Sequence, residues 1–368
     1  MRIVYVYAAL ATRGGVERIL ADKMNHLAAI DGYEVSLITY NQGQHPVSFP
    51  LDTRVQHIDL RVSTHQQYRY RGLHRQWKAF QLNRLLYRRM KEQLANLVPD
   101  IIVTTTAGEF SLLLKVKGST PLLVESHGGY DHLIDYPQMT WWHRWDIRRR
   151  YRQLHRAAAI VTLTERDAER WRKHYSQVHM IPNMVHLNPT DRYVTGEQQR
   201  VIFVGRLAEQ KGIPELVAVW RKVFAKHPDW SLEVFGDGSL ASLLQQEEGV
   251  HLHASVDDIF SQYVKASLLI VTSRWEPFGL VIPEAMSCGL PVVSFEGDGP
   301  CDIITDGKDG FLVKGRSVED FADRVCQLIE NQTLRRQMGQ TAIQSAQRYA
   351  AEKILPQWKQ LFEVFVKR

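Results

Sequence analysis

The chain has 368 residues, of which 44% are hydrophobic and 23% charged, and its formal net charge is +6. This composition is that of a folded globular protein rather than a disordered chain, and the length suits two domains rather than one. No apolar run approaches the roughly 20 residues of a membrane-spanning helix, and the three cysteines form no zinc-type or disulfide-type pattern.

The first half of the chain alternates apolar runs with helical patterns. A buried strand is predicted over residues 2–10, followed by a turn at Gly14 and Gly15 and a helix to about Ala29. A strand, a glycine turn and a helix form the phosphate-approach geometry of a Rossmann-like unit. The Gly-x-Gly-x-x-Gly fingerprint is missing, which disfavours a nicotinamide oxidoreductase. Further strands are predicted over 34–40, 55–60, 101–105, 122–126 and 160–163, so the fold class is α/β with a parallel sheet.

Two segments of this half combine basic and aromatic residues. A helix predicted over 73–97 carries Leu73, Trp77 and Phe80 at helical spacing among arginines and lysines, and residues 141–152 interleave tryptophans with arginines. The helix can lie on an anionic membrane or pack its apolar stripe against the protein. The second segment could stack on single-stranded nucleic acid. Because no nucleic-acid-binding module surrounds it, we expect no nucleic-acid partner and predict contact with an anionic membrane surface, or with a lipid-pyrophosphate, through 69–91 and 141–156.

A single histidine, His127, follows the strand predicted over 122–126 and precedes two glycines. Most lone histidines are structural or solvated, but ligands of open α/β sheets bind beyond the carboxyl ends of the strands, so this histidine is better placed for a function than most.

The chain becomes polar between 185 and 199, which predicts a domain boundary, and the same order of elements then restarts. A strand over 201–204 leads to Gly205, Arg206 and Lys211, and a strand over 231–235 leads to Gly236 and Asp237. A guanidinium and an ammonium beside a strand end could neutralise a diphosphate, although a basic pair at such a turn is more often solvent-facing.

The most informative stretch is residues 268–295, whose pattern is that of strand, loop, helix, turn and strand. Glu276 lies in the loop and Glu284 in the helix. The amides of Gly279, Leu280 and Val281 at the helix start would point outward, where the helix dipole favours an anion. A diphosphate would fit there, with one carboxylate reaching sugar hydroxyls and the other a ribose; solvated helix-capping acids are the alternative.

Two motifs of the second half resemble the signatures of one family. The run Ser-Arg-Trp-Glu276-Pro-Phe-Gly-Leu-Val-Ile-Pro-Glu284 and the run Gly205-Arg206-Leu-x-x-x-Lys211-Gly are similar to those of the family-4 retaining glycosyltransferases, glycosyl transferases group 1, of GT-B fold. Weaker likenesses occur at Gly14-Gly15, His127 and Gly236. The resemblance implies two facing Rossmann-like domains with parallel sheets and a cleft between them. The acceptor-binding domain would be 1–184 joined by a C-terminal helix, 354–368; a linker, 185–199, would lead to a nucleotide-sugar-binding domain, 200–353.

The resemblance also implies roles for individual residues. The catalytic residues would be His127, Arg206, Lys211 and Glu276. The donor-binding residues would be Gly14, Gly15, Gly205, Gly236, Asp237, Phe278, Gly279, Leu280, Val281 and Glu284. We expect no metal and no cofactor, because cations and amides aimed at the leaving phosphate can stabilise its charge and no Asp-x-Asp stands at a strand end.

The implied activity is retaining transfer of a hexose or N-acetylhexosamine from a nucleotide sugar to a glycan acceptor. UDP is the expected carrier, with GDP as the alternative, and the expected acceptor is lipid-linked, as in bacterial surface polysaccharide or glycolipid assembly. A GT-B sugar-nucleotide epimerase and a non-catalytic protein that binds nucleic acid or a membrane surface are the rival interpretations. Residues 1–7 lead directly into a strand without a secretion signal, which predicts a cytoplasmic protein, peripheral on the inner face of the cell membrane.

Overall fold

A computed structural model describes residues 1–134, 140–189, 193–194 and 197–366. The chain divides into two compact units, Met1–Pro182 with Leu355–Arg368, and Asn183–Ile354. Residues 190–192 and 195–196 of the expected linker lie outside the described residues, and the rest of 185–199 belongs to the second unit.

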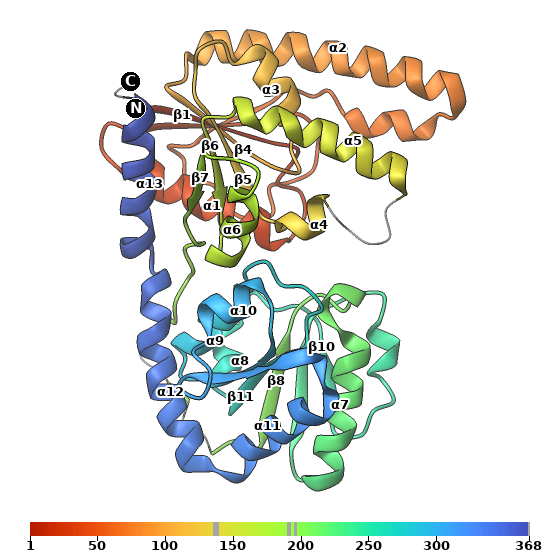
Figure 1. Cartoon of the computed structure of the whole chain (residues 1–368), viewed down its shortest axis with the longest axis vertical. Coiled ribbons are helices and arrows are strands. Elements are labelled where there is room, and N and C mark those ends of the chain that lie inside the picture. The colour runs from red at the N-terminus through yellow and green to blue at the C-terminus, as the bar shows by residue number, and fades with distance from the viewer. Residues whose placement is uncertain (135–139, 190–192, 195–196, 367–368) are drawn as a thin grey trace. The chain divides into compact units, whose positions relative to one another are not determined.

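The first unit is built on a seven-stranded parallel sheet of order β3-β2-β1-β4-β5-β6-β7. Its strands are β1 Arg2–Tyr7, β2 Glu34–Thr39, β3 Gln56–Asp59, β4 Ile101–Thr105, β5 Leu122–Ser126, β6 Ala159–Thr162 and β7 Val178–Met180. Its helices are α1 Gly15–Ala28, α2 Gly72–Leu97, α3 Phe110–Val116, α4 Tyr130–Ile134, α5 Trp141–Tyr151, α6 Glu165–Arg172 and most of α13, Ala351–Val366. Helices α2 and α3 cover one face of this sheet and α1 covers the other (Figure 1).

The second unit contains a six-stranded parallel sheet of order β10-β9-β8-β11-β12-β13. Its strands are β8 Arg200–Val204, β9 Ser231–Phe235, β10 Val250–His253, β11 Leu268–Val271, β12 Val292–Phe295 and β13 Gly310–Val313. Its helices are α7 Ile213–Lys226, α8 Phe260–Tyr263, α9 Val281–Ser287, α10 Asp298–Ile303, α11 Val318–Glu330 and α12 Gln332–Ala346. Both units are therefore Rossmann-like, and the predicted α/β class is confirmed.

The two sheets share a topological feature that places ligand sites. In each sheet the strand order reverses between two neighbours, β1 and β4 in the first unit and β8 and β11 in the second. Open parallel sheets bind ligands at such a switch point, beyond the carboxyl ends of the strands. The loops that follow β8 and β11 are accordingly the expected ligand-binding loops of the second unit.

The first strand is shorter than predicted. The sequence predicts a strand over 2–10, but β1 ends at Tyr7. Beyond it the carbonyl of Ala8 accepts the amides of Tyr40 and Asn41, and the amide of Leu10 donates to the side chain of Gln42 at 2.8 Å. Leu10 is buried although it lies outside the sheet ladder, so its apolar character reflects burial rather than strand pairing.

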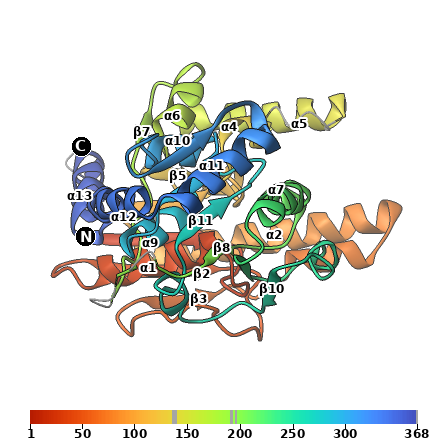
Figure 2. The same ribbon diagram turned by 90° about the horizontal axis from the view of Figure 1, so that it is seen from below.

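Helix α2 packs only its C-terminal half. Leu82, Leu86, Met90 and Leu94 are buried in the core of the first unit. The large apolar residues of the N-terminal half that precede Leu82 are exposed instead, Leu73 by 82%, Trp77 by 58% and Phe80 by 65%. In both views this half of α2, and likewise α5, extends past the edge of the first unit's sheet (Figures 1 and 2). The packed-stripe interpretation is thus correct for one half of the helix only. No helix in the described part of the chain is long and apolar enough to cross a bilayer.

Candidate active site

The loops after β8 and β11 meet through an ion pair. The ε-ammonium of Lys211 donates to Oε2 of Glu276, and the hydroxyl of Ser273 donates to the same oxygen at 3.0 Å. The Lys211 side chain is 18% exposed and that of Glu276 is 9% exposed. A cation and a carboxylate therefore stand side by side at the switch point of the sheet, with part of the lysine open to a ligand.

Glycines allow these two loops to approach. Gly212 has a φ of +65°, and a Cβ at this position would lie 2.0 Å from the carbonyl oxygen of Thr272. The Thr272 hydroxyl donates to the carbonyl of Lys211 at 2.9 Å, and the amide of Arg274 donates to the carbonyl of Gln210 at 2.8 Å. At Gly212 the backbones of the two loops approach so closely that there is no room for a side chain.

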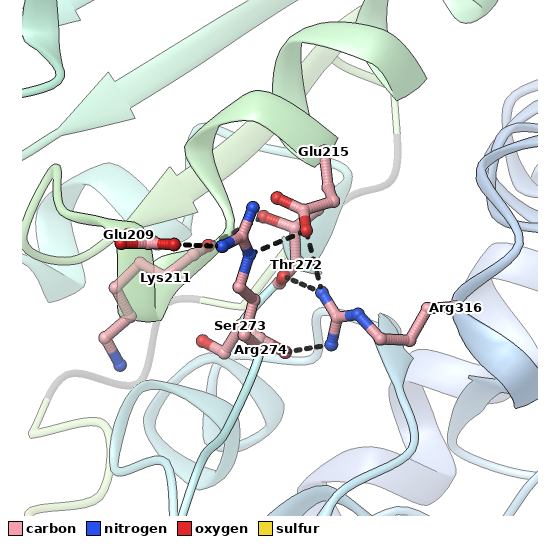
Figure 3. A network of polar contacts seen from close by, with 7 residues as sticks. All are labelled: Glu209, Lys211, Glu215, Thr272, Ser273, Arg274 and Arg316. Atoms are coloured by element: carbon pink, nitrogen blue, oxygen red, sulfur yellow. Dashed lines mark hydrogen bonds and ion pairs between the residues drawn. The ribbon is translucent and has the colours of Figure 1, made fainter. Parts of the chain in front are cut away.

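A network of charged side chains fixes the β11 loop from the other side (Figure 3). Arg274 pairs with Glu209 and, at 2.8 Å, with Glu215. Arg316 pairs with the same Glu215 oxygen at 3.4 Å and donates to the carbonyls of Ser273 at 3.0 Å and Thr272 at 3.3 Å. The hydrogen bond to Glu215 raises the pKa of Arg274, so this arginine stays charged. The Lys211 ammonium points away from both arginines (Figure 3).

The β8 loop also contacts the loop after β9. A Cβ at Gly236 would lie 2.0 Å from the carbonyl oxygen of Gly205, and the amide of Leu207 donates to the carbonyl of Asp237 at 2.9 Å. A Cβ at Gly205 would lie 3.5 Å from Cε of Lys211, so the lysine stem passes over this glycine. Arg206 is exposed, and among the described residues no side chain pairs with its guanidinium. The predicted residues Gly205, Lys211, Gly236 and Glu276 are thus brought together beside Arg206.

Three other residues predicted to bind the donor have side chains that contact parts of the second unit other than Lys211 and Glu276. The Glu284 carboxylate is buried, with Oε2 3.5 Å from the hydroxyl of Tyr263. The Phe278 ring is buried edge-on against Tyr349, with ring centroids 5.4 Å apart. The Asp237 carboxylate accepts from the amide and hydroxyl of Ser255 at 3.2 and 3.0 Å. Two of these side chains therefore contact helical residues, Tyr263 and Tyr349, and the third joins two loops.

The start of α9 follows a tight turn. Gly279 has a φ of +89°, and a Cβ there would lie 2.9 Å from Cγ of Glu276. Leu280 and Val281 are partly exposed, and the amide of Ile282 donates to the carbonyl of Gly279 at 2.9 Å. The amides of Gly279, Leu280 and Val281 precede the first hydrogen bonds of the helix, as expected from the sequence.

The remaining predicted residues belong to the first unit. Gly14 caps α1 and Gly15 begins it. The Glu17 carboxylate reaches back so that a Cβ on Gly14 would lie 2.2 Å from it, and it accepts from the hydroxyls of Tyr7 and Thr12 at 3.0 Å each. His127 directly follows β5, and its Nε2 lies 3.0 Å from Oε2 of Glu125.

Several residues of these networks were not predicted. Ser273 and Arg274 lie inside the quoted motif, and Gly212 ends another, so motif position was a usable signal for them. Arg316 and Glu125 carry no sequence pattern that points to the site. Among the described residues, no group of three or more His, Cys, Asp or Glu side chains could hold a metal ion.

Two protein-family models match the chain. Residues 13–188 match "Glycosyltransferase Family 4", and residues 191–345 match "Glycosyl transferases group 1". An uncharacterized glycosyltransferase of Haemophilus influenzae is 27% identical over 97% of this chain and 99% of its own length. The amylovoran biosynthesis glycosyltransferase AmsD of Erwinia amylovora is 32% identical over an alignment that covers 56% of this chain and 62% of AmsD.

The fold is shared with solved structures. A crystal structure of a mutant of S. aureus TarM, in complex with fondaparinux, alpha-GlcNAc-glycerol and UDP, superposes with a TM-score of 0.77. The likeness covers 98% of this chain and 99% of that one at 15% identity, so it shows the fold alone. The chain therefore belongs to the glycosyltransferases, with a family 4 domain followed by a group 1 domain, and it is a transferase enzyme of GT-B fold.

Proposed function

We propose that this protein is a retaining, metal-independent glycosyltransferase that moves a hexose or N-acetylhexosamine from a UDP-sugar to a lipid-linked glycan acceptor. The observation that carries the proposal is the pair of Lys211 and Glu276 at the switch point between β8 and β11. A diphosphate needs a cation and a sugar needs a hydrogen-bond acceptor, and this pair offers both within one contact.

The chemistry follows from where charge develops. As the bond between the sugar C1 and the donor phosphate breaks, the phosphate gains negative charge and the sugar becomes oxocarbenium-like. Lys211 and the exposed Arg206 would face the phosphate, while Glu276 would accept from sugar hydroxyls. The acceptor oxygen then bonds to C1 on the face that the phosphate leaves, and its proton passes to a phosphate oxygen.

Glu276 is poorly placed to act as an enzymatic nucleophile. Its Oε2 is engaged by both Lys211 and Ser273, and the residue is 8% exposed. Glu284, the second carboxylate of the motif, is 1% exposed. Glycosidases instead use two carboxylates that flank the scissile bond. This arrangement supports front-face attack without a covalent intermediate, and hence retention.

The donor base is proposed by comparison. TarM, which shares the fold, was crystallised with UDP and with alpha-GlcNAc-glycerol. AmsD carries amylovoran biosynthesis in its name, which supports a glycan acceptor. On these grounds we propose UDP as the carrier and polysaccharide or glycoconjugate assembly as the process.

Calorimetric titration tests the donor assignment. The purified protein is titrated with UDP, GDP and their common sugar conjugates in EDTA, next to Lys211→Met and Glu284→Ala. We expect binding of the UDP compounds, lost or weakened in both variants. Binding of GDP compounds alone would change the carrier, and no nucleotide binding would overturn the proposal. Conversion of the donor to an isomeric UDP-sugar without transfer would identify an epimerase instead.

The exposed surface of the first unit supports a membrane-linked acceptor. Leu73, Trp77 and Phe80 project from α2 among the exposed basic residues Arg71, Arg75 and Arg84. On α5, Trp141 is 65% and Trp145 59% exposed. A hollow of about 500 Å³ beside them is lined by Trp141, Arg144, Trp145, Arg148, Arg149 and Arg152. Indoles at headgroup depth and arginines on phosphates are the groups that an anionic bilayer or a lipid-phosphate attracts.

Vesicle co-sedimentation tests this surface. We expect binding to vesicles that contain phosphatidylglycerol, weaker binding to pure phosphatidylcholine, and release by salt. The double variant Trp77→Ser with Phe80→Ser should lose most of the binding. The matched control is Leu243→Ser, because Leu243 is 43% exposed on the second unit. Equal sedimentation of the double variant and the wild type would exclude α2 as the contact.

A further inference from the structure

A buried charge network lies beneath His127 in the first unit. Strand β5 directs Glu125 toward α1, where the ammonium of Lys23 donates to Oε2 of Glu125 at 2.6 Å. His127 Nε2 lies 3.0 Å from the same oxygen. The side chains are 3% exposed for Lys23, 1% for Glu125 and 8% for His127. One carboxylate oxygen thus links a helix, a strand and the loop that carries the predicted catalytic histidine.

The lysine is held by a second element. Its ammonium lies 3.9 Å from the centroid of the Trp358 ring, which α13 supplies and which is buried. A ring face attracts a desolvated ammonium. The position of Lys23 is therefore set by Glu125 on one side and by the indole on the other.

The network is costly for a purely structural contact. Taking two charges out of water carries a large penalty, and a well-packed apolar pair is often as stable or more so. Oε1 of Glu125 and the hydroxyl of Tyr5 are both buried without a hydrogen-bond partner among the described residues. Burial and the nearby Glu125 raise the pKa of Tyr5 well above its usual value, so Tyr5 stays neutral. A role in orienting the His127 ring would account for keeping these charges buried.

The charge state of Glu125 fixes the proton on the histidine. Burial raises the pKa of the Glu125 carboxyl, but Lys23 and His127 outweigh it and lower the pKa to about 2. The carboxylate is consequently ionised at neutral pH and can only accept hydrogen bonds. Nε2 of His127 must then carry a proton, which leaves Nδ1 as the second functional nitrogen of the ring. Among the described residues, the His127 ring has no second hydrogen-bond partner.

We propose that Glu125 and Lys23 are positioning residues that hold His127 as its Nε2–H tautomer and present Nδ1 to a sugar hydroxyl of the substrate. This inference rests on the proposed function for the sugar contact, but the tautomer itself does not depend on it. Glu125 orients the ring. The positive charge of Lys23 keeps the Glu125 carboxylate ionised, so that this carboxylate does not take up the proton of His127 or a proton from water.

Nitrogen-15 NMR of the imidazole rings tests the tautomer without any substrate. In the wild type at neutral pH, the His127 signals, assigned by their absence in His127→Asn, should show a protonated Nε2. In Glu125→Gln the amide can donate as well as accept, so a mixed or reversed tautomer is expected. In Lys23→Met the Glu125 carboxylate loses its neutralising charge. The pair of Glu125 and His127 should then bind one proton more than it does in the wild type. Lys23→Arg keeps the charge and should preserve the wild-type pattern.

Kinetics separates positioning from folding. We expect Glu125→Gln and Lys23→Met to lower kcat for UDP-sugar turnover by about 10- to 100-fold, with a small change in KM and unchanged UDP binding. Lys23→Arg should recover most of kcat.

A wild-type His127 protonated on Nδ1 alone would overturn the proposal even if a variant fails to fold. An unchanged tautomer in Glu125→Gln, or an altered tautomer with wild-type kcat, would also overturn it. Absence of UDP-sugar turnover in the wild type would instead defeat the proposed function, while the NMR result would still stand.

Discussion

Lys211 and Glu276 are 65 residues apart in the sequence, yet the lysine ammonium donates directly to the glutamate carboxylate. The two residues meet because β8 and β11 are neighbours in the sheet, so the loops beyond both strands end at one point. The contact joins a group suited to a phosphate with a group suited to sugar hydroxyls.

Removing the cation of this pair should affect catalysis strongly. In Lys211→Met the leaving phosphate loses a positive charge, and Glu276 keeps a poorly exposed carboxylate without its counter-ion. We expect kcat to fall by roughly 100- to 1,000-fold, which corresponds to about 3 kcal/mol of transition-state stabilisation. UDP release from UDP-sugar measures this. Lys226→Met, which breaks an exposed pair with Asp323, is the control and should leave kcat unchanged. A Lys211→Met enzyme within about twofold of the wild type would show that Lys211 does not face the phosphate.

A single methyl group should separate the two loops. In Gly212→Ala the new Cβ would meet the Thr272 carbonyl oxygen at 2.0 Å, which pushes the Lys211 loop away from the Glu276 loop. We expect the variant to fold but to bind UDP-sugar at least tenfold more weakly in calorimetry. Gly315→Ala is a matched control, because Gly315 has a similar φ of +63° and open space around it. A left-handed alanine costs about 1–2 kcal/mol in both variants, and only Gly212→Ala adds the clash. Equal donor affinity in the two would argue against a donor site at this contact.

The Arg316 network should contribute measurable stability to the second unit. Arg316→Ala removes hydrogen bonds to the carbonyls of Thr272 and Ser273 and an ion pair with Glu215. Because a hydrogen bond from a charged donor is stronger than a neutral one, we expect a loss of about 2 kcal/mol in the free energy of unfolding. Thermal unfolding followed by calorimetry measures the loss. Arg221→Ala removes an ion pair with Glu247. The Arg221 side chain is 68% exposed, so water screens this pair and the variant should lose less stability than Arg316→Ala. The reverse order of the two costs would contradict this account of the loop.

Acid should destabilise the first unit through Glu125. The folded-state pKa of this carboxyl is lowered to about 2 from an ordinary value of 4.5. Between these values the unfolded chain binds a proton that the folded protein does not. The contribution of Glu125 is therefore complete above pH 4.5 and is lost as the pH falls toward 2.

Urea unfolding at several pH values measures this effect. The free energy of unfolding should fall more steeply with acid in the wild type than in Glu125→Gln, which has no carboxyl at this position. Glu247→Gln is the comparison for a carboxyl with an exposed partner, since Arg221 lowers the pKa of Glu247 but the Arg221 side chain is 68% exposed and water screens the pair. Parallel curves for the wild type and Glu125→Gln would mean that Glu125 is not ionised in the folded protein at low pH.

Local patterns in the chain were enough to establish the α/β class, the repeated order of strands and helices, and the two motifs that carry Lys211 and Glu276. Strands at 101–105, 122–126, 231–235 and 268–271 are marked by short apolar runs, and motif residues follow the strand ends within a few positions. A strand followed by a glycine turn predicts a ligand-facing loop. This prediction does not require knowing which strands pair with it in the sheet.

Which of these loops meet depends on the folded chain as a whole. The sequence placed Lys211 and Glu276 in two separate motifs, and their ion pair became visible only through the pairing of β8 with β11. Arg316 and Glu215 come together from 101 residues apart, and Lys23 and Glu125 from 102. The pairing of strands and the packing of helices on a sheet are set by side-chain complementarity across the whole unit, which no short pattern in one segment encodes.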